Sequence, residues 1–255
     1  MNEIVSLFSE SHTVAFMLLF FRFGSLFMAT PIFSHNNIPM SLKAAMAFFF
    51  TIVFYPSMPP LAIHIDTATI VLAILGEMLL GLSVGIVLQL AYNAITFAGG
   101  QISFMMGFSM ASAIDPQSGV SMPIVSQFLS LIALMILLAL DLHHWILLFV
   151  DASLKTIPLG GFIITHDLFN YVVHAASQMF VVGFMIAFPI IALSLLADII
   201  FGMLMKTMPQ FNLLVIGFPI KITVAFVVII ATLSATMLII KGQMQDAFNM
   251  LEMLF

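Results

Sequence analysis

Long apolar stretches, separated by short segments rich in polar residues, proline or glycine, make up most of the chain. Most reach or approach the roughly 20 residues that a transmembrane helix needs. They cover approximately residues 13–33, 44–53, 67–97, 124–140, 168–197 and 213–240. The pattern predicts an all-α integral membrane protein with about six long apolar helices, arranged as helical hairpins.

Prolines and polar residues interrupt several of these predicted helices. A proline inside a helix removes a hydrogen bond and kinks the chain, so we expect a kink at Pro189 and a break near Pro219. Residues 146–166 are less uniformly apolar and predict a helix, a break and a short second piece. We expect a polar interruption at residues 198–212 and a short amphipathic tail after residue 240.

Composition supports a membrane protein without a soluble domain. The 255 residues are 63% hydrophobic and 7% charged, whereas soluble domains carry about 25% charged residues. We therefore interpret residues 1–255 as a single membrane domain. The net charge of −5 argues against nucleic-acid binding, and the lack of cysteine excludes disulfides and thiolate metal sites. Lysines are spread too evenly along the chain for the positive-inside rule to give an orientation.

One stretch, residues 99–123, breaks the apolar pattern without resembling a soluble loop. Glycines, serines and Asp115-Pro116 interrupt it. Irregular backbone at membrane depth is tolerated only where it is buried in protein or lines a cavity. Methionine adapts to irregular neighbours, so we expect an internal plug loop that forms a deformable apolar seal. Its candidate residues are Phe104, Met105, Met106, Gly107, Phe108, Ser109, Met110, Asp115 and Pro116.

Four ionisable residues lie within or beside the apolar runs: Arg22, Glu77, Asp198 and Lys221. Charges at such positions are expensive, and they face an interior, a cavity or a partner. A proton or ion relay is one interpretation. We favour a structural role, in which Arg22 pairs with a carboxylate or with carbonyl groups of a neighbouring helix, because a relay needs carboxylates repeated along one path.

Asp141, His143 and His144 are the one cluster that suggests a metal site. Adjacent histidines on a helix point to different faces, and the metalloprotease pattern needs histidines four residues apart with a glutamate between them. We therefore interpret this segment as the polar tip of a hairpin, and expect no metal and no cofactor. The chain also lacks the G-x-S-x-G nucleophile elbow and the Walker motif, so we do not expect an enzyme.

Several short motifs together resemble a known family. They are Met208-Pro209-Gln210-Phe211-Asn212, Gly217-Phe218-Pro219-Ile220-Lys221, Gly100-Gln101, Met106-Gly107-Phe108-Ser109-Met110-Ala111, Asp115-Pro116, and Asp141-Leu142-His143-His144 with Ser153 and Pro158-Leu159-Gly160 beyond. In this order they resemble the FliR/SctT family of type III secretion export-gate proteins, over almost the whole chain. Arg22 with Pro31, and Lys43, also fit that family.

The resemblance implies a subunit of the flagellar export gate in the bacterial inner membrane, at the flagellar basal body. Such a protein joins FliP-like and FliQ-like subunits, with an FlhB-like subunit around the entrance, and unfolded flagellar proteins pass through the assembly. The family's plug loop maps to residues 99–123. The chain would comprise a FliP-like part, roughly 1–165, and a FliQ-like hairpin, roughly 166–255. Arg22, Glu77 and Lys221 would then meet partner helices.

A different function stays open on the residues alone. A secondary transporter or an ion-channel subunit for a small solute would also be apolar and kinked. A transporter of that kind favours inverted repeats with matched broken helices and a polar site at the membrane midplane. The breaks at Pro189 and Pro219 have no matching pair in the first half of the chain.

Overall fold

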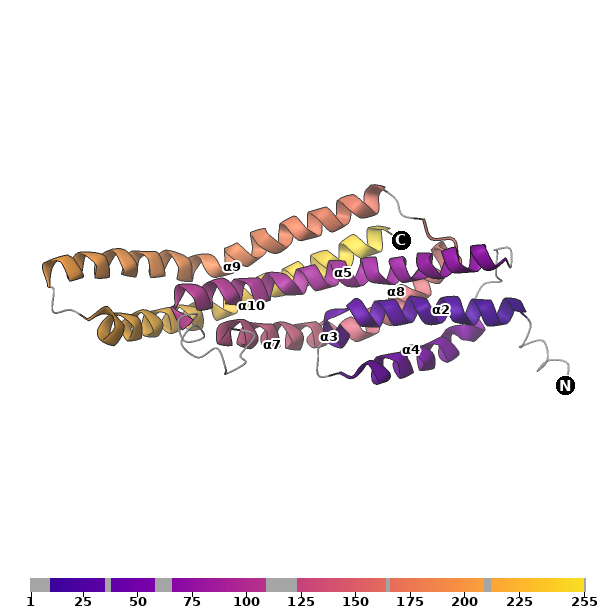
Figure 1. Cartoon of the computed structure of the whole chain (residues 1–255), viewed down its shortest axis with the longest axis horizontal. Coiled ribbons are helices and arrows are strands. Elements are labelled where there is room, and N and C mark those ends of the chain that lie inside the picture. The colour runs from indigo at the N-terminus through magenta and orange to yellow at the C-terminus, as the bar shows by residue number, and fades with distance from the viewer. Residues whose placement is uncertain are drawn as a thin grey trace. The chain divides into compact units, whose positions relative to one another are not determined.

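A computed structural model describes residues 10–34, 38–57, 66–108, 123–163, 166–208 and 212–254. Within these ranges every regular element is helical and no strand occurs, which confirms the predicted all-α class. The elements are α2 (Glu10–Ala29), α3 (Pro31–Ser34), α4 (Met40–Phe54), the 3₁₀ turn η1 (Tyr55–Ser57), α5 (Thr67–Met105), α7 (Ile124–Ala139), α8 (Leu142–Thr156), α9 (His166–Thr207), the π-helical turn η3 (Leu213–Gly217) and α10 (Phe218–Leu254) (Figure 1).

The described part of the chain has four helices that are long and apolar enough to cross a membrane, namely α2, α5, α9 and α10. A fifth span results if α7 and α8 are taken together, because they form a pair bent by 56° at a short break. The second apolar run forms only the 15-residue helix α4. The membrane character is thus as predicted, with four or five long spans in place of about six. The polar tip expected at residues 141–145 falls at this break.

Three helices extend beyond the limits that the sequence predicted. The helix α5 continues through Gly99 and Gly100 to Met105, and α9 continues through Asp198 to Thr207. The expected amphipathic tail is the continuous end of α10. Pro189 lies inside α9, and the ribbon of that helix changes direction near its middle (Figure 1). Tertiary packing therefore keeps glycine and aspartate helical where their low propensity predicted an interruption.

The helices group into two compact units, each built from discontinuous segments. The first unit contains residues 1–90, 137–176 and 246–255. In it α2 packs against α4 through an aromatic cluster, where Phe23 and Phe54 have ring centroids 5.3 Å apart and Phe27 lies 5.7 Å from Phe50. The rings of Phe23 and Phe27 are almost completely buried. Dispersion contacts between these closely packed rings help to hold the two helices together.

Small residues bring α2 and α5 into close contact in the first unit. A Cβ atom added at Gly81 would lie 2.1 Å from the Ser25 Oγ atom, and one added at Gly85 would lie 2.3 Å from the Ala29 Cβ atom. Only glycine fits at these two positions. Close approach of this kind lets helices associate inside a membrane, where lipid offers no hydrophobic driving force.

The second unit contains residues 91–136 and 177–245. Here α5 approaches α7 so closely that a Cβ atom at Gly99 would lie 2.3 Å from the Ser126 Cα atom. The Ser126 hydroxyl donates a hydrogen bond to the Thr96 carbonyl at 2.6 Å, and the Tyr92 hydroxyl donates to the Ser130 carbonyl at 3.3 Å. Hydrogen bonds between a side chain and a neighbouring helix backbone add specificity to this packing.

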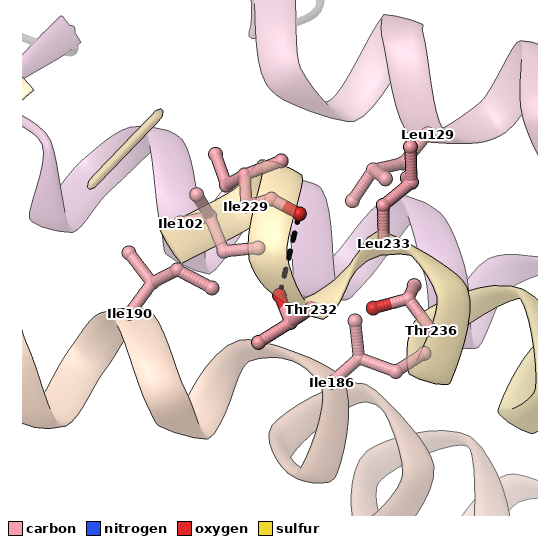
Figure 2. Close-up of a pocket in the computed structure, with 8 residues that line it drawn as sticks. All are labelled: Ile102, Leu129, Ile186, Ile190, Ile229, Thr232, Leu233 and Thr236. Atoms are coloured by element: carbon pink, nitrogen blue, oxygen red, sulfur yellow. Dashed lines mark hydrogen bonds between the residues drawn. The ribbon is translucent and has the colours of Figure 1, made fainter. Parts of the chain in front are cut away.

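A small cavity of about 10 Å³ lies among α5, α7, α9 and α10 in the second unit (Figure 2). Its lining residues are Ile102, Leu129, Ile186, Ile190, Ile229, Thr232, Leu233 and Thr236. The hydroxyl of Thr232 is already used, because it donates to the Val228 carbonyl at 2.8 Å. A space of this size holds about one water molecule, so this cavity is too small for a transported solute.

Candidate functional site

The end of α5 carries the described part of the predicted plug. Met106 is completely buried, whereas the Phe104 side chain is 62% exposed. Gly107 has φ +85°, a left-handed conformation that ends the helix and that other residues rarely adopt. A Cβ atom at Gly107 would also lie 2.7 Å from the Phe218 ring. The ring of Phe108 lies 6.5 Å from that of Phe226, centroid to centroid.

Only part of the predicted plug loop can therefore be placed. Residues 99–105 are helical, so this portion is not an irregular loop. The other plug candidates, Ser109, Met110, Asp115 and Pro116, lie outside the described residues. What the structure shows is a helix end with one buried methionine, one exposed phenylalanine and a glycine that redirects the chain.

The family motif near the start of α10 is likewise described only in part. Pro209 and Gln210 lie outside the described residues. The carbonyl of Asn212 accepts the Ile216 N–H at 3.0 Å, at the beginning of the turn η3. Gly217 is buried, and Pro219 is the second residue of α10, directly after the π-helical turn η3. The helix type thus changes from π to α just before Pro219, near the position where the sequence predicted a break.

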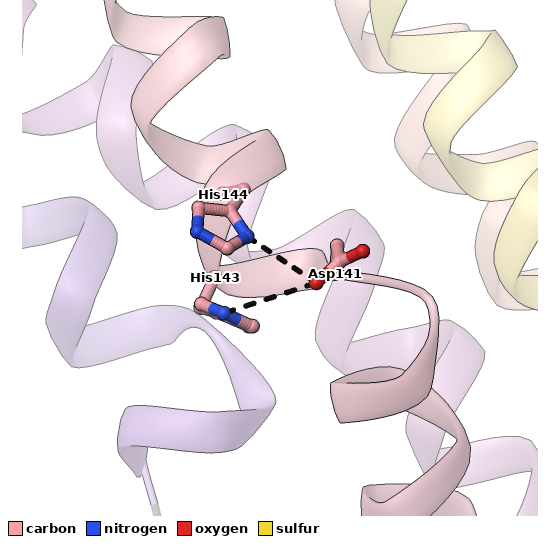
Figure 3. Close-up of side chains that lie close together, drawn as sticks. All are labelled: Asp141, His143 and His144. Carbon is pink, nitrogen blue, oxygen red and sulfur yellow. Dashed lines mark hydrogen bonds and ion pairs between the residues drawn. The ribbon is translucent and has the colours of Figure 1, made fainter.

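Asp141, His143 and His144 come together just before and within the first turn of α8 (Figure 3). Asp141 has φ 56° and is the only residue other than glycine with a positive φ in the described ranges. Its Oδ1 atom lies 3.2 Å from the His144 Nδ1 atom and 3.9 Å from the His143 Nε2 atom. The two imidazole rings are 4.1 Å apart, centroid to centroid.

This arrangement corrects the expectation that the two adjacent histidines diverge. Both rings turn toward Asp141 (Figure 3). The reason is their place in the first turn of α8, where no preceding helical turn restricts the rotamers. All three side chains are substantially exposed, with exposed fractions of 71%, 42% and 66% for Asp141, His143 and His144.

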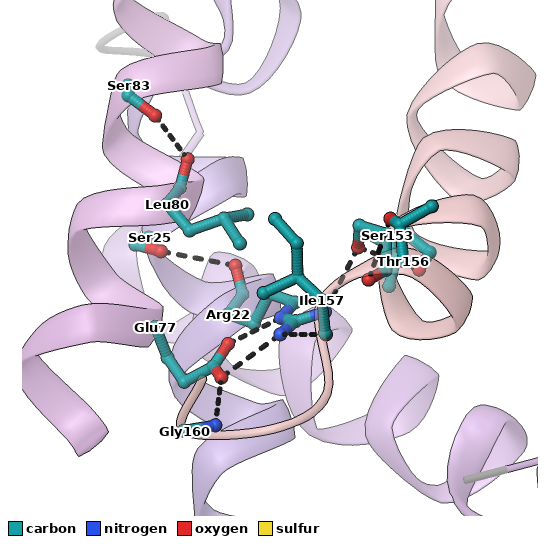
Figure 4. Close-up of polar contacts among 10 residues, drawn as sticks. Arg22, Ser25, Glu77, Leu80, Ser83, Ser153, Thr156, Ile157 and Gly160 are labelled. Carbon is teal, nitrogen blue, oxygen red and sulfur yellow. Dashed lines mark hydrogen bonds and ion pairs between the residues drawn. The ribbon is translucent and has the colours of Figure 1, made fainter. Parts of the chain in front are cut away.

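A buried charge network lies between α2, α5 and the end of α8 (Figure 4). Arg22 and Glu77 are both 0% exposed. The Arg22 Nε atom donates to the Glu77 carboxylate, and the Nη2 atom donates to Glu77 Oε1 at 3.0 Å. This bidentate geometry is the strongest form of an arginine–carboxylate pair. The position of Arg22 in an apolar run predicted a carboxylate partner on a neighbouring helix, and Glu77 on α5 is that partner.

The same network holds the segment that follows α8. The Arg22 guanidinium also donates to Ser153 Oγ at 3.1 Å and to the Ile157 carbonyl at 3.2 Å. Glu77 Oε1 accepts the N–H of Gly160 at 2.8 Å. Gly160 has φ +76°, which turns its N–H toward Glu77 in a way that favours glycine. Because every partner is buried or partly buried, losing one of the two charges leaves the other uncompensated.

Lys221 and Asp198 form a second ion pair, between α10 and α9 in the second unit. The Lys221 Nζ atom donates to both carboxylate oxygens, at 2.7 and 2.8 Å. The lysine side chain is 9% exposed and the aspartate side chain is 53% exposed. All four charges singled out from the sequence are thus paired within the chain, and each pair belongs to one unit. This pairing favours the structural interpretation over a relay.

Sequence reasoning identified Arg22 and Glu77 but did not link them to Ser153, Ile157 and Gly160. These partners lie 83 to 135 positions away along the chain. The one local signal was Pro158-Leu159-Gly160, which predicts a turn. Nothing in the sequence indicates that this turn donates a hydrogen bond to Glu77.

Comparison with known proteins gives the family context. The sequence matches the family described as "Bacterial export proteins, family 1" over residues 13–247. It is 32% identical over 246 residues to the flagellar biosynthetic protein FliR of Bacillus subtilis (strain 168), which covers 95% of this chain and 93% of that protein. The protein of the same name from Escherichia coli (strain K12) is 28% identical over 230 residues, covering 90% and 88%. That of Pectobacterium carotovorum is 32% identical over 205 residues, covering 80% and 78%.

Proposed function

The chain belongs to family 1 of the bacterial export proteins, and from that membership we propose that it is a subunit of the flagellar type III protein export gate. One observation carries this proposal: the family match runs from residue 13 to residue 247. It includes the end of α5, both ion pairs and the Asp141–His144 segment. Relatives named for flagellar biosynthesis cover most of the chain as well. The long apolar helices fit the membrane location that such a gate requires.

In this proposal the chain forms part of a channel for unfolded flagellar proteins and acts without catalysis or a cofactor. The end of α5 and the residues that follow contribute a Met- and Phe-rich plug. Flexible methionine side chains can close a pore when it is idle and yield around a chemically varied polypeptide. A narrow apolar constriction also stops ions by excluding water. The exposed Phe104 ring and the chain redirection at Gly107 support this role.

The proposed partners are FliP-like and FliQ-like subunits, with an FlhB-like subunit at the entrance, in the bacterial inner membrane at the flagellar basal body. The FliP-like part spans roughly residues 1–165 and the FliQ-like hairpin roughly 166–255. Support comes from exposed apolar surface: only 33% of the most apolar window of α9 and 17% of that of α10 are buried within the chain. Helices so little covered by their own chain suit contact with other subunits or lipid.

The buried charges have an indirect role in assembly under this proposal. Arg22 and Glu77 satisfy one another inside the first unit. They hold the Ile157–Gly160 segment against α2 and α5, and so preserve the surface that the first unit offers to a partner. Lys221 acts in the same way in the second unit, through Asp198. Because Asp198 keeps an exposed carboxylate edge, a partner helix can approach this second pair directly.

Mild detergent extraction from the native bacterium tests the proposal. We expect a tagged copy of the chain to co-purify with FliP-like and FliQ-like membrane proteins in a fixed ratio. We also expect deletion of the gene to stop secretion of flagellar proteins. A chain that purifies alone and transports a small solute in liposomes would contradict the proposal and favour the transporter interpretation.

The plug is tested separately, by membrane conductance. Removing residues 105–110 should make assembled complexes leak ions and small solutes in resting cells, because the apolar seal is lost. Complexes of normal yield with unchanged conductance would show that this segment does not seal the pore. The control is Gly24→Ala, a change inside α2 and outside the plug, at a position where an added Cβ atom meets nothing within 4 Å.

A further inference from the structure

We propose that Asp141, His143 and His144 form a binding site for a single divalent transition-metal cation, with Zn²⁺ as the ion that best matches the donors. Neither export nor the family relationship assigns a ligand to this segment. The proposal rests on side-chain geometry and is independent of the proposed function.

The first argument is that the three donors converge. One ligand atom from each of Asp141, His143 and His144 lies within 4.8 Å of the others. The nitrogens that face Asp141 are Nε2 of His143 and Nδ1 of His144 (Figure 3). The other ring nitrogen of His143 is buried and makes no hydrogen bond to any residue the structure describes. Nε2 is therefore the atom through which His143 can bind a ligand.

The second argument is the chemistry of the donor set. Two neutral imidazoles and one carboxylate are ligands that Zn²⁺ takes in proteins, with bonds of about 2.0–2.2 Å. A tetrahedral ion with such bonds needs donors about 3.3 Å apart. The present separations, up to 4.8 Å, are somewhat wider. The side chains are 71%, 42% and 66% exposed, so small rotamer changes can close the site. Water would complete the coordination.

The third argument is the backbone at Asp141. Its left-handed conformation is unfavourable for a residue with a Cβ atom, and it is the only one of its kind among the described non-glycine residues. Strain of this sort persists only where the surrounding structure holds it in place. Here it directs the carboxylate toward the two rings without any side-chain cap on α8. The carboxylate also offsets the repulsion between a cation and the positive N-terminal end of α8.

Metal binding would have a mechanical consequence at the break between α7 and α8. The three ligands belong to four consecutive residues, which begin before α8 and end in its first turn. A bound cation would fix the conformation of this short segment where α8 begins. The cation would also bind the exposed side chains of Asp141, His143 and His144, for which lipid offers no polar partner.

Binding can be measured on the full-length chain extracted in mild detergent and freed of metal with a chelator. We expect equilibrium dialysis against Zn²⁺ to show one more bound ion per chain in the wild type than in Asp141→Asn. Asparagine tolerates the left-handed backbone but removes the charge. His143→Gln and His144→Gln should each weaken Zn²⁺ binding by at least about 10- to 100-fold. Removing a residue that only hydrogen-bonds to a metal ligand already lowers metal affinity by that factor. His174→Gln, a change of an exposed histidine on α9, should leave it unchanged.

A spectroscopic readout gives a second, independent test. Trp145 is the only tryptophan of the chain and directly follows His144. Co²⁺ bound at the site should quench its fluorescence, and added Zn²⁺ should reverse the quenching, whereas Mg²⁺ should not. The proposal is overturned if Asp141→Asn and His144→Gln bind Zn²⁺ as the wild type does. It is equally overturned if His174→Gln lowers binding to the same extent, since the ion would then be held by scattered surface histidines.

Discussion

Breaking the Arg22–Glu77 pair should destabilise the first unit far more than breaking an exposed ion pair. Both side chains are 0% exposed, so either charge alone would be buried without its partner. Removing one member of a buried pair costs about 3–5 kcal/mol. We therefore expect Glu77→Leu and Arg22→Met each to lower the free energy of unfolding by about that amount.

The double variant Arg22→Met/Glu77→Leu should be much milder than the two single changes suggest. It removes both charges and leaves the Gly160 N–H as the main orphaned group, at a cost of about 1–3 kcal/mol. The Ser153 hydroxyl keeps a partner, because it donates to the Val150 carbonyl at 2.9 Å. The summed single effects are about 6–10 kcal/mol, so the coupling should be at least about 3 kcal/mol.

The assay is unfolding of the detergent-solubilised chain, followed by Trp145 fluorescence. This residue stacks on Phe149 and Phe248 within the first unit, at centroid distances of 5.5 and 4.9 Å, so its signal reports on the unit that contains the network. Lys155→Ala is the matched control, because its pair with Asp151 is 2.6 Å long but exposed. Such a pair is worth about 0.3–0.5 kcal/mol.

Two outcomes would refute the reasoning. A loss of stability in Glu77→Leu no larger than that in Lys155→Ala would show that the pair is hydrated in the folded protein. A loss in the double variant equal to the sum of the two single losses would show that the charges act independently. In the proposed export gate, Arg22→Ala should lower the yield of complex without changing leakage. Normal yield with altered leakage would instead assign Arg22 to the gating step.

Glycine substitutions and the plug deletion give the remaining predictions. Gly107→Ala should destabilise the chain by about 1–3 kcal/mol and reduce flagellar secretion, because φ at this position is +85° and the added Cβ atom would lie 2.7 Å from the Phe218 ring. Gly100→Ala should leave the melting temperature unchanged or raise it, because an added Cβ atom there meets nothing within 4 Å. Gly81→Ala should lower the free energy of unfolding by about 1–3 kcal/mol, because the added methyl group separates α2 from α5. Gly24→Ala is the control, since an added Cβ atom there meets nothing within 4 Å. Equal melting temperatures of the two variants would contradict this prediction. Removing residues 105–110 should raise the resting conductance of assembled complexes.

The sequence by itself determined the class of the protein and the positions of its charged residues. Apolar runs of 20 residues and more can be stable only in a membrane or between other helices, so the all-α membrane architecture followed from hydropathy. Arg22 and Glu77 stood out for the same reason, since a charge in such a run needs a partner. The short motifs around Gly107, Asp141 and Pro219 carried the resemblance to the family, which the match over residues 13–247 shows.

Tertiary structure decided which partner each group has and where the helices end. The Gly160 N–H reaches Glu77 across 83 positions, and no local pattern encodes a contact of that range. Helix α5 passes through Gly99 because Ser126 of α7 packs against it, so a neighbouring helix overrides a weak local propensity. His143 and His144 share Asp141 because a left-handed residue precedes the first turn of α8. Hydropathy indicates whether a segment lies in water or in an apolar environment. Hydrogen-bond partners and helix ends depend instead on which segments pack against each other.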